Sequence, residues 1–440
     1  MENRKIYDFI GIGIGPFGLG LAALSDQVKG MEALFFEQHF KFDWHPGMLI
    51  DGTDLQVPFL ADLVTAADPT SPYSFLNYLH EQGRLSSYYL FRKFNIPRKE
   101  YNRYAQWAAG SLDQCLFGRR VEDVIYHEAE ENPFYEVKVF NREDRETECY
   151  HARHMVLGTG SIPNIPEGFE EGQETDVFHT SEYLFREPSL KKGNTITVIG
   201  SGQSAAEVFY DLLQDQQRCG YQLSWFTRSS GIFQLESAKM AQEMFSAEYV
   251  EYFHRLSFEQ RIEALSTFSQ LRKGVEPETL NLIYDLLYER TIDQDESPVT
   301  IQPLTEATGI ESIDKGYRLT LHQWQEGHTF THDTEKVILA TGYKPDIPEW
   351  VDRFKDELVW EDEKRFKVTQ DYRLVFKKER PNAFFTLTNL EHSHGTGATN
   401  LWLSVKRNQK IVNSIAGRDI YPVEKDKMFQ QFSQRFENTP

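Results

Sequence analysis

The sequence predicts an α/β fold with two Rossmann-like dinucleotide-binding domains and a smaller helical region. Two glycine-rich motifs carry this prediction: Gly13-x-Gly15-x-x-Gly18 near the start of the chain and Gly200-x-Gly202-x-x-Ala205 near its middle. Each comes directly after a short apolar run typical of a buried strand and leads into a segment of helical character, as the dinucleotide-binding fingerprint requires. A chain of 440 residues is long enough for two or three domains with substantial cores.

The charge and the cysteines exclude several classes of protein. A formal net charge of −20 argues against nucleic-acid binding and against anionic membranes, because either needs a basic surface, whereas a small cationic substrate would suit it. Cys115, Cys149 and Cys219 are far apart and form no CxxC pair, so neither a disulfide framework nor a redox dithiol is indicated. We find no signal-type stretch and no run of about 20 apolar residues, and we therefore expect a cytoplasmic protein.

The first glycine motif has the full context of a nucleotide site. Its first glycine permits the tight strand-to-helix turn, its second lets a pyrophosphate approach backbone amides at the helix N-terminus, and its third allows close helix–strand packing. The next strand, 33–36, leads into an acid about 20 residues beyond the motif, where a carboxylate would hold the ribose hydroxyls. The expected contacts are Gly13, Gly15, Pro16, Phe17, Gly18 and Glu37.

An aromatic and proline-rich loop comes next, with Trp44, His45 and Met48. Two interpretations stay open for it: a flat apolar wall against an isoalloxazine ring, or a packed connector. Residues 55–64 read as a short apolar helix, and 98–109 as an amphipathic helix whose aromatic residues belong to the core.

The second motif differs from the first in the residues at the end of its second strand. Gly200, Gly202, Gln203 and Ser204 open the predicted helix, and the strand 223–226 ends at Thr227-Arg228 instead of an acid. An arginine at this place can pair with a 2′-phosphate, which favours NADPH here and FAD at the first site. The alternative is that Arg228 is an ordinary solvated surface charge.

Domain boundaries are expected at repeated strand-and-glycine turns. Gly158-Thr-Gly160 and Ala340-Thr341-Gly342-Tyr343 each come after a buried apolar strand. We expect a first part of the FAD domain at 1–165, the NADPH domain at 166–340 with a helical substrate-region insertion at about 232–296, and a second part of the FAD domain with a substrate-site segment at 341–440. The helix expected from about Asn400 starts after a glycine-rich loop, where Leu401 can meet a cofactor edge.

A chain that binds FAD and NADPH but has no redox dithiol is expected to transfer a hydride from NADPH to the flavin and then to pass the electrons to an acceptor. The obvious acceptor is O2. His392 and His394 are one residue apart on a loop and lack further ligand-rich segments, so no metal site is predicted.

These residues resemble the flavin-dependent N-hydroxylating monooxygenases that act on lysine, ornithine or diamines in hydroxamate siderophore biosynthesis. The resemblance runs nearly the whole length and rests on 15–18, Trp44-His-Pro-Gly-Met48, 69–79, 202–205, Ala340-Thr-Gly-Tyr343 and His394-Gly395. It implies a discontinuous FAD domain, an NADPH domain and a helical substrate region. It also implies that NADPH reduces FAD, that O2 forms a C4a-hydroperoxyflavin, and that the neutral amine attacks its distal oxygen. Gln56 looks like the family glutamine beside the flavin.

Departures from the family bear on the substrate. Where the amino-acid hydroxylases carry a lysine that pairs with the substrate carboxylate, this chain has Ala61. Family asparagines and a serine near the amino-acid substrate are replaced by Gln242, Leu271 and Trp402. The hypothesis is therefore a simple diamine: putrescine, cadaverine or 1,3-diaminopropane. The proposed partners of its distal ammonium are Glu243 and Glu391.

Two alternatives differ in substrate or in class. The first is lysine N6-hydroxylation with another carboxylate anchor, Arg98 or Lys273. The second is a flavin- and NADPH-binding redox sensor that does not oxygenate, which amine-dependent hydroxylamine formation would distinguish. The family resemblance also implies a homo-oligomer, a dimer or a tetramer.

Overall fold

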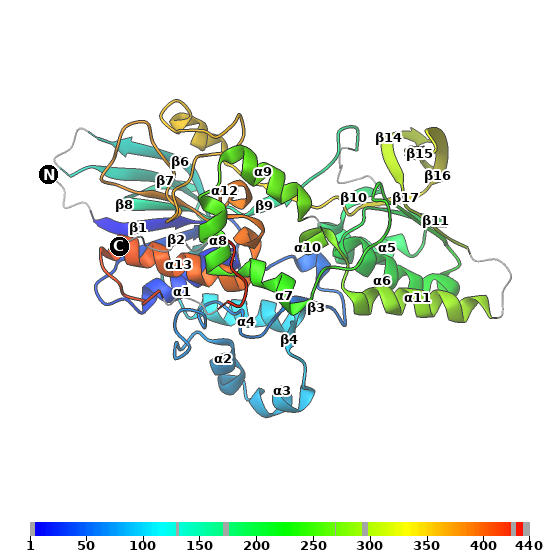
Figure 1. Cartoon of the computed structure of the whole chain (residues 1–440), viewed down its shortest axis with the longest axis horizontal. Coiled ribbons are helices and arrows are strands. Elements are labelled where there is room, and N and C mark those ends of the chain that lie inside the picture. Colours follow the sequence, from blue (N-terminus) through cyan, green and yellow to red (C-terminus); the bar gives the residue numbers. More distant parts are fainter. Residues whose placement is uncertain are drawn as a thin grey trace.

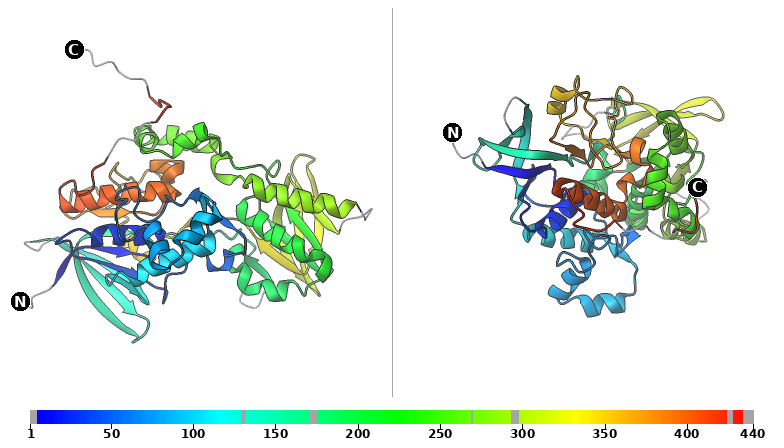
Figure 2. Two further views of the ribbon diagram at one scale, coloured as in Figure 1. Left: turned by 90° about the horizontal axis from the view of Figure 1, so that it is seen from below. Right: turned by 60° about the vertical axis from the view of Figure 1, so that its left-hand side comes forward.

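The computed structural model describes residues 5–128, 132–169, 176–268, 270–292, 298–423 and 428–433. Two lobes lie side by side along the longest axis of the molecule, each built on its own sheet (Figure 1). Figure 2 shows the same two lobes from two further directions. The predicted α/β fold class is confirmed. None of the helices in the described ranges is long and apolar enough to cross a membrane.

The first lobe contains a seven-stranded sheet of order β5-β2-β1-β8-β7-β6, with β19 paired to β8. Strands β5, β2, β1 and β8 are parallel, and β1 is buried from Phe9 to Ile12. Strands β7 and β6 run antiparallel, and β7 alternates buried with half-exposed residues from Tyr135 onward. The strands are β1 (Ile6–Ile12), β2 (Ala33–Glu37), β5 (Cys115–Phe117), β6 (Arg119–His127), β7 (Phe134–Asn141), β8 (Glu146–Leu157) and β19 (Phe384–Thr386).

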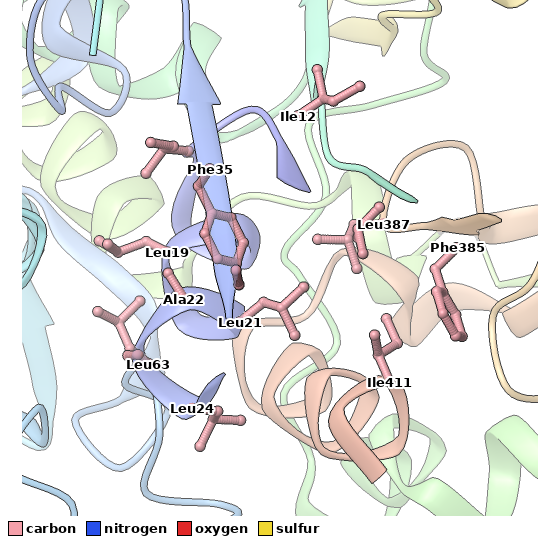
Figure 3. Close-up of a cluster of buried hydrophobic side chains, with 14 of the residues drawn as sticks. Ile12, Leu19, Leu21, Ala22, Leu24, Phe35, Leu63, Phe385, Leu387 and Ile411 are labelled. Atoms are coloured by element: carbon pink, nitrogen blue, oxygen red, sulfur yellow. The ribbon is translucent and has the colours of Figure 1, made fainter. Parts of the chain in front are cut away.

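Helices from both ends of the chain cover this sheet. The first helix, α1 (Pro16–Asp26), packs against α13 (Leu401–Ala416), so the C-terminal part of the chain closes the N-terminal nucleotide unit. Figure 3 shows this contact, with Leu21 facing Ile411 and Leu387. Helices α2 (Phe75–Glu81), α3 (Leu85–Phe91) and α4 (Arg98–Gly110) also belong to this lobe.

The second lobe contains a five-stranded parallel sheet of order β10-β17-β11-β12-β13, flanked by α5 (Tyr183–Leu190) and α6 (Gln203–Cys219). A separate antiparallel sheet comes after β13. The strands are β10 (Val177–His179), β11 (Thr195–Ile199), β12 (Gln222–Phe226), β13 (Val299–Gln302), β14 (Thr305–Ile313), β15 (Gly316–Gln323), β16 (His328–Thr334) and β17 (Lys336–Leu339).

The chain crosses between the lobes on two adjacent extended segments. Strand β9 (Ser161–Pro163) leaves the first lobe and β18 (Tyr343–Pro345) returns to it, and the two pair antiparallel. A hydrogen bond from Asn164 N to Gly342 O at 2.9 Å extends this pairing. Both crossings therefore lie at one seam.

The helices predicted as one insertion divide between the lobes. Helices α8 (Ala247–His254) and α9 (Phe258–Thr267) pack against α12 (Glu391–His394) of the first lobe, whereas α11 (Pro277–Thr291) packs against α6 of the second. The remaining short elements of this part are α7 (Lys239–Gln242), η3 (Glu243–Phe245) and α10 (Gln270–Lys273).

Most predicted elements are confirmed, including the helix over 98–109 and the strands around both glycine motifs. The helix predicted over 55–64 is wrong. Residues Asp54–Pro58 form β3, which pairs with β4 (Asn95–Pro97), and turns come after it. The apolar run is short because Pro58 interrupts it, and a run of this length does not distinguish strand from helix by periodicity.

Candidate functional site

The first glycine motif has the close backbone contacts that its residues require. Gly13 has φ +95°, and a Cβ there would lie 2.3 Å from Gly158 O. A Cβ on Gly18 would lie 2.2 Å from Gly13 O, whereas none of the described atoms lies within 4 Å of the Cβ position of Gly15. Pro16 and Phe17 are the first two residues of α1. The space beside Gly15 is therefore open at a helix N-terminus, which is where a pyrophosphate binds.

Glu37 lies at the end of β2, next to this opening. Its Oε2 accepts a hydrogen bond from Ile14 N at 3.0 Å, and its Oε1 accepts one from His39 N at 3.0 Å. Burial opposes ionisation, yet these bonds and the His39 ring hold the pKa of Glu37 below its usual value. A carboxylate has about four acceptor positions, so an ionised Glu37 keeps capacity for ribose hydroxyls.

The 44–48 loop packs across the seam between the lobes. Trp44 contacts Tyr101 of α4 at 5.3 Å between ring centroids, while Met48 belongs to the core of the second lobe. The His45 ring nitrogen lies 3.2 Å from the Tyr343 hydroxyl oxygen. Burial, with the charges of Arg98 and His179, lowers the pKa of His45 to about 4, so the imidazole is neutral at pH 7. The connector interpretation describes these contacts; the flavin-wall interpretation stays a prediction.

The second motif repeats the first one closely. Gly200 has φ +144°, and a Cβ there would lie 2.3 Å from Ala340 O. Nothing described lies within 4 Å of the Cβ position of Gly202, the N-cap of α6. Gln203 Nε2 donates to Glu207 Oε1 at 2.8 Å, and Gln203 Oε1 accepts from Glu276 N at 2.7 Å. Gln203 therefore fixes α6 against α11, while half-buried Ser204 lies in the first turn of α6.

Arg228 comes just after β12 at the same edge of the sheet as Gly200. Phe226 O accepts a hydrogen bond from Gly200 N at 3.0 Å, and Ser229 Oγ donates to Ser201 Oγ at 2.9 Å. The Arg228 side chain is 77% exposed, and its guanidinium lies 3.5 Å from Glu306 Oε1. An exposed guanidinium beside a glycine motif fits a 2′-phosphate, and its role stays a prediction.

Arg98 links the two lobes. Its guanidinium donates to both carboxylate oxygens of Glu207, at 2.6 and 2.8 Å. Arg98 begins α4 in the first lobe and Glu207 lies in α6 of the second; their side chains are 18% and 4% exposed. This pairing occupies Arg98, which the sequence had suggested as a carboxylate anchor. The second suggested anchor, Lys273, is exposed on α10.

Three predicted substrate residues lie around one hollow of about 290 Å³ between α7, η3 and the start of α13. Glu243 accepts hydrogen bonds from Phe429 N at 3.0 Å and Gln430 N at 2.8 Å, which lower its pKa. Glu243 thus holds the C-terminal segment over this region. Lys239, Phe245, Ser246 and Met428 were not predicted, because no motif marks them. The hollow is lined by Lys239, Gln242, Glu243, Phe245, Ser246, Trp402 and Met428.

The other predicted substrate and flavin residues lie elsewhere. Ala61 is 2% exposed in the core of the first lobe, and Leu271 is 8% exposed on α10. Gln56 is exposed and lies on β3 instead of the helix predicted over 55–64, and its role beside the flavin stays a prediction. Glu391 begins α12, and Leu401, which is buried, begins α13. None of these side chains lines the hollow.

His392 and His394 are buried parts of the α12 packing. His392 Nε2 lies 2.7 Å from Phe366 O, and the His394 ring stacks on Tyr372 at 4.1 Å between centroids. Burial lowers the pKa of both rings, which favours neutral imidazoles. In the described ranges neither histidine belongs to a group of three potential metal ligands.

Comparison with known proteins identifies the family. A family model described as L-lysine 6-monooxygenase/L-ornithine 5-monooxygenase matches residues 5–345. The chain belongs to this family. The resemblance to flavin-dependent N-hydroxylating monooxygenases is confirmed, and members of this family are enzymes that oxygenate an amine nitrogen, which sets the redox-sensor alternative aside.

Three relatives cover nearly the whole chain. The putrescine N-hydroxylase of Shewanella oneidensis is 39% identical over 98% of this chain and 85% of its own length. The structure of DfoA bound to FAD, the cadaverine monooxygenase of Erwinia amylovora, superposes with a TM-score of 0.94 at 40% identity, covering 99% of this chain and 100% of that one. The ornithine N-hydroxylase KtzI of Kutzneria sp. 744, with reduced FAD, NADP+ and L-ornithine, superposes with a TM-score of 0.87 at 26% identity over 94% and 99%.

Proposed function

We propose that this monooxygenase uses FAD, NADPH and O2 to hydroxylate one primary amine of an aliphatic diamine, in hydroxamate siderophore biosynthesis. Putrescine, cadaverine and 1,3-diaminopropane are the candidate substrates. The observation that carries the substrate class is position 61, a buried alanine where the amino-acid hydroxylases carry the lysine that pairs with the substrate carboxylate. Arg98, another anchor that the sequence suggests, is bound to Glu207. Similarity to a putrescine N-hydroxylase and to a cadaverine monooxygenase supports the same class.

We expect FAD and NADPH to bind at different glycine motifs. The opening beside Gly15 and the acceptor Glu37 suit FAD, and the opening beside Gly202 with exposed Arg228 suits NADPH. Bound FAD, once reduced by NADPH, supplies the activated oxygen. The seam formed by the 44–48 loop, β9 and β18 carries the contacts that hold the lobes in one orientation.

The protein has to bind the amine and keep it neutral, because a free lysine-like ammonium has a pKa of roughly 10.4. Contact with apolar side chains favours the uncharged form by desolvation. We propose that Trp402, Phe245 and Met428 hold the aliphatic part of the diamine in the hollow that they line. The distal ammonium then has polar neighbours in Gln242 and Ser246.

A substrate comparison tests this proposal. Hydroxylamine formation coupled to NADPH oxidation is expected with putrescine, cadaverine or 1,3-diaminopropane at a kcat/KM at least about tenfold above that with L-lysine, the difference that one lost charge-assisted bond produces. A clearly higher kcat/KM with L-lysine than with any of the three diamines would contradict the proposal.

Lys239 offers a matched test, since it is a cation on the wall of the hollow. For a diamine, Lys239→Ala removes a like charge and is expected to leave KM unchanged or lower it. For L-lysine, the same substitution removes a carboxylate partner and is expected to raise KM. Lys364→Ala is the control, because that residue is exposed, does not line the hollow and is not one of the suggested carboxylate anchors.

Arg228→Ala is expected to raise the KM for NADPH by roughly tenfold or more and to change the KM for NADH little, because a charge-assisted bond contributes about 1.5–3 kcal/mol and NADH lacks the 2′-phosphate. Steady-state kinetics with both coenzymes measure this. Arg318→Ala removes another exposed arginine of the same lobe, away from the motif. Equal effects of Arg228→Ala on both coenzymes would refute the assignment.

We also propose a homo-oligomer in the cytoplasm. The half of α3 that bears Tyr89, Leu90 and Phe91 is exposed and apolar, with side chains 77%, 68% and 47% exposed, which supports a contact between copies. No disulfide joins Cys115, Cys149 and Cys219, which suits a reducing compartment. A monomer mass in light scattering at working concentration contradicts the oligomer.

A further inference from the structure

We propose that His127, Glu136, Cys149 and His151 form a Zn2+-binding site on the antiparallel part of the first sheet. No motif in the sequence indicates it, since the four residues come from three strands and the sequence predicts no metal site. One donor atom from each of Glu136, Cys149 and His151 lies within 4.8 Å of the other two. His127 Nε2 lies 3.2 Å from Glu136 Oε2.

The strand register brings these side chains to one face. Glu136 of β7 is directly opposite His151 of β8, and Cys149 is opposite Lys138, two residues along β7. Residues two apart on a strand share a face. His127 of β6 is opposite Phe134, also on that face. The cluster therefore arises from the pairing of long, regular strands and not from a flexible loop.

Phe134 fixes the two imidazoles. Its buried ring stacks on His127 at 4.8 Å between centroids and meets His151 edge-on at 5.2 Å. The neighbouring cation Lys138 is turned toward Asp123, with 3.7 Å between Nζ and Oδ2. The Lys138 ammonium on this face therefore has its own anionic partner.

The donor set suits Zn2+. This ion takes four ligands from imidazole, thiolate and carboxylate, with bonds of roughly 2.0–2.3 Å. Tetrahedral geometry with such bonds separates the ligand atoms by roughly 3.3–3.8 Å. Side-chain rotations that move the donor atoms of Glu136, Cys149 and His151 by about 1 Å bring them from within 4.8 Å to those separations. His127 Nε2 is already 3.2 Å from Glu136 Oε2. Calcium and magnesium prefer oxygen ligands and do not match this set.

The site is remote from the proposed flavin position. From His151, β8 continues for six residues to Leu157, which immediately precedes Gly158 at the first glycine motif. At about 3.3 Å per residue this is roughly 20 Å. Bound Zn2+ would therefore tie β6, β7 and β8 together and take no part in oxygen transfer.

Equilibrium dialysis of the full-length, FAD-loaded protein against Zn2+, after removal of metal with a chelator, tests this site. We expect one Zn2+ per chain, and an affinity at least about tenfold weaker in Cys149→Ser and in His151→Asn. The matched controls are Cys219→Ser, the other cysteine that is not buried, and His322→Asn, a histidine on the separate sheet of the second lobe. Unchanged binding in Cys149→Ser and His151→Asn, or no Zn2+ bound to the wild-type protein, overturns the proposal.

A second measurement needs no substitution. Iodoacetamide alkylates accessible thiols, and mass mapping reports Cys149 and Cys219 separately. Zn2+ is expected to slow alkylation of Cys149 at least about tenfold and to leave Cys219 unchanged, because coordination by a metal ties up the thiolate electron pair that attacks the reagent. Equal alkylation of Cys149 with and without Zn2+ contradicts the site even if a variant fails to fold.

Discussion

Arg98→Ala is expected to lower the free energy of unfolding by about 3–5 kcal/mol, because it leaves the Glu207 carboxylate buried without its cation. Glu207 is 4% exposed, and both of its oxygens accept hydrogen bonds from Arg98. One further donor remains, Gln203 Nε2 at 2.8 Å. A neutral amide cannot replace a guanidinium that neutralises the charge.

The loss of unfolding free energy caused by Arg98→Ala should depend on pH. Burial raises the pKa of Glu207 above its ordinary value of 4.5, even though Arg98 and Gln203 act to lower it. Without Arg98 the folded-state pKa rises further, so the folded protein binds a proton that the unfolded chain has released. The contribution of this group to stability therefore falls as the pH rises from 4.5 through the raised pKa. Arg98→Ala should be least harmful at acidic pH and most harmful above the folded-state pKa.

Urea unfolding of the FAD-loaded protein across this pH range measures both effects. Arg318→Ala is the control, because Arg318 also binds one carboxylate, that of Asp333, through two hydrogen bonds, at 2.7 and 2.8 Å, and this pair is solvent-exposed. That pair is expected to contribute only about 0–1 kcal/mol. If Arg98→Ala lowers the free energy of unfolding no more than Arg318→Ala does at every pH, the buried pair of Arg98 and Glu207 does not stabilise the contact between the lobes.

The sequence predicted those parts of the site that depend on local backbone geometry. Gly13, Gly18 and Gly200 were predictable because each lies where another backbone carbonyl comes within 2.3 Å of the Cβ position, and spacing alone reveals that requirement. Glu37 was predictable for a related reason, since the parallel neighbour of the first strand ends next to the motif. The contact between Gly18 and Gly13 and the place of Glu37 are fixed within about 25 residues of chain, whereas the carbonyls that crowd Gly13 and Gly200 belong to the distant residues Gly158 and Ala340.

Contacts between distant segments could not be predicted in this way. Arg98 and Glu207 are 109 residues apart, and Glu243 meets Phe429 across 186 residues, so no periodicity or motif connects them. The hollow shows the same limit of sequence-based prediction. Gln242 and Trp402 were predicted because they differ from the residues that the family has at those positions, whereas nothing in the sequence pointed to Lys239. Such residues become visible only when the fold brings their elements together.

The other large effect is expected on nucleotide binding, when the second glycine of a motif is replaced by alanine. Gly15→Ala is expected to weaken FAD binding roughly 5- to 150-fold, the effect of about 1–3 kcal/mol of steric overlap with a group that approaches the backbone closely. Without FAD the substitution should be nearly neutral, because Gly15 has φ −74° and no described atom within 4 Å of its Cβ position. Gly110→Ala is the control, since that glycine of α4 also has open space around it.

Fluorescence titration of the apoprotein with FAD, together with the melting temperature of the apoprotein, separates ligand contact from folding. Gly18→Ala should lower both FAD affinity and apoprotein stability, because its Cβ would meet Gly13 O at 2.2 Å whether FAD is bound or not. Wild-type FAD affinity in Gly15→Ala would refute the placement of the pyrophosphate. Gly202 has the same open surroundings, so Gly202→Ala should weaken NADPH and leave FAD unaffected. Within the two motifs, the backbone crowds Gly13, Gly18 and Gly200, whereas Gly15 and Gly202 have the open space beside them that a nucleotide would fill.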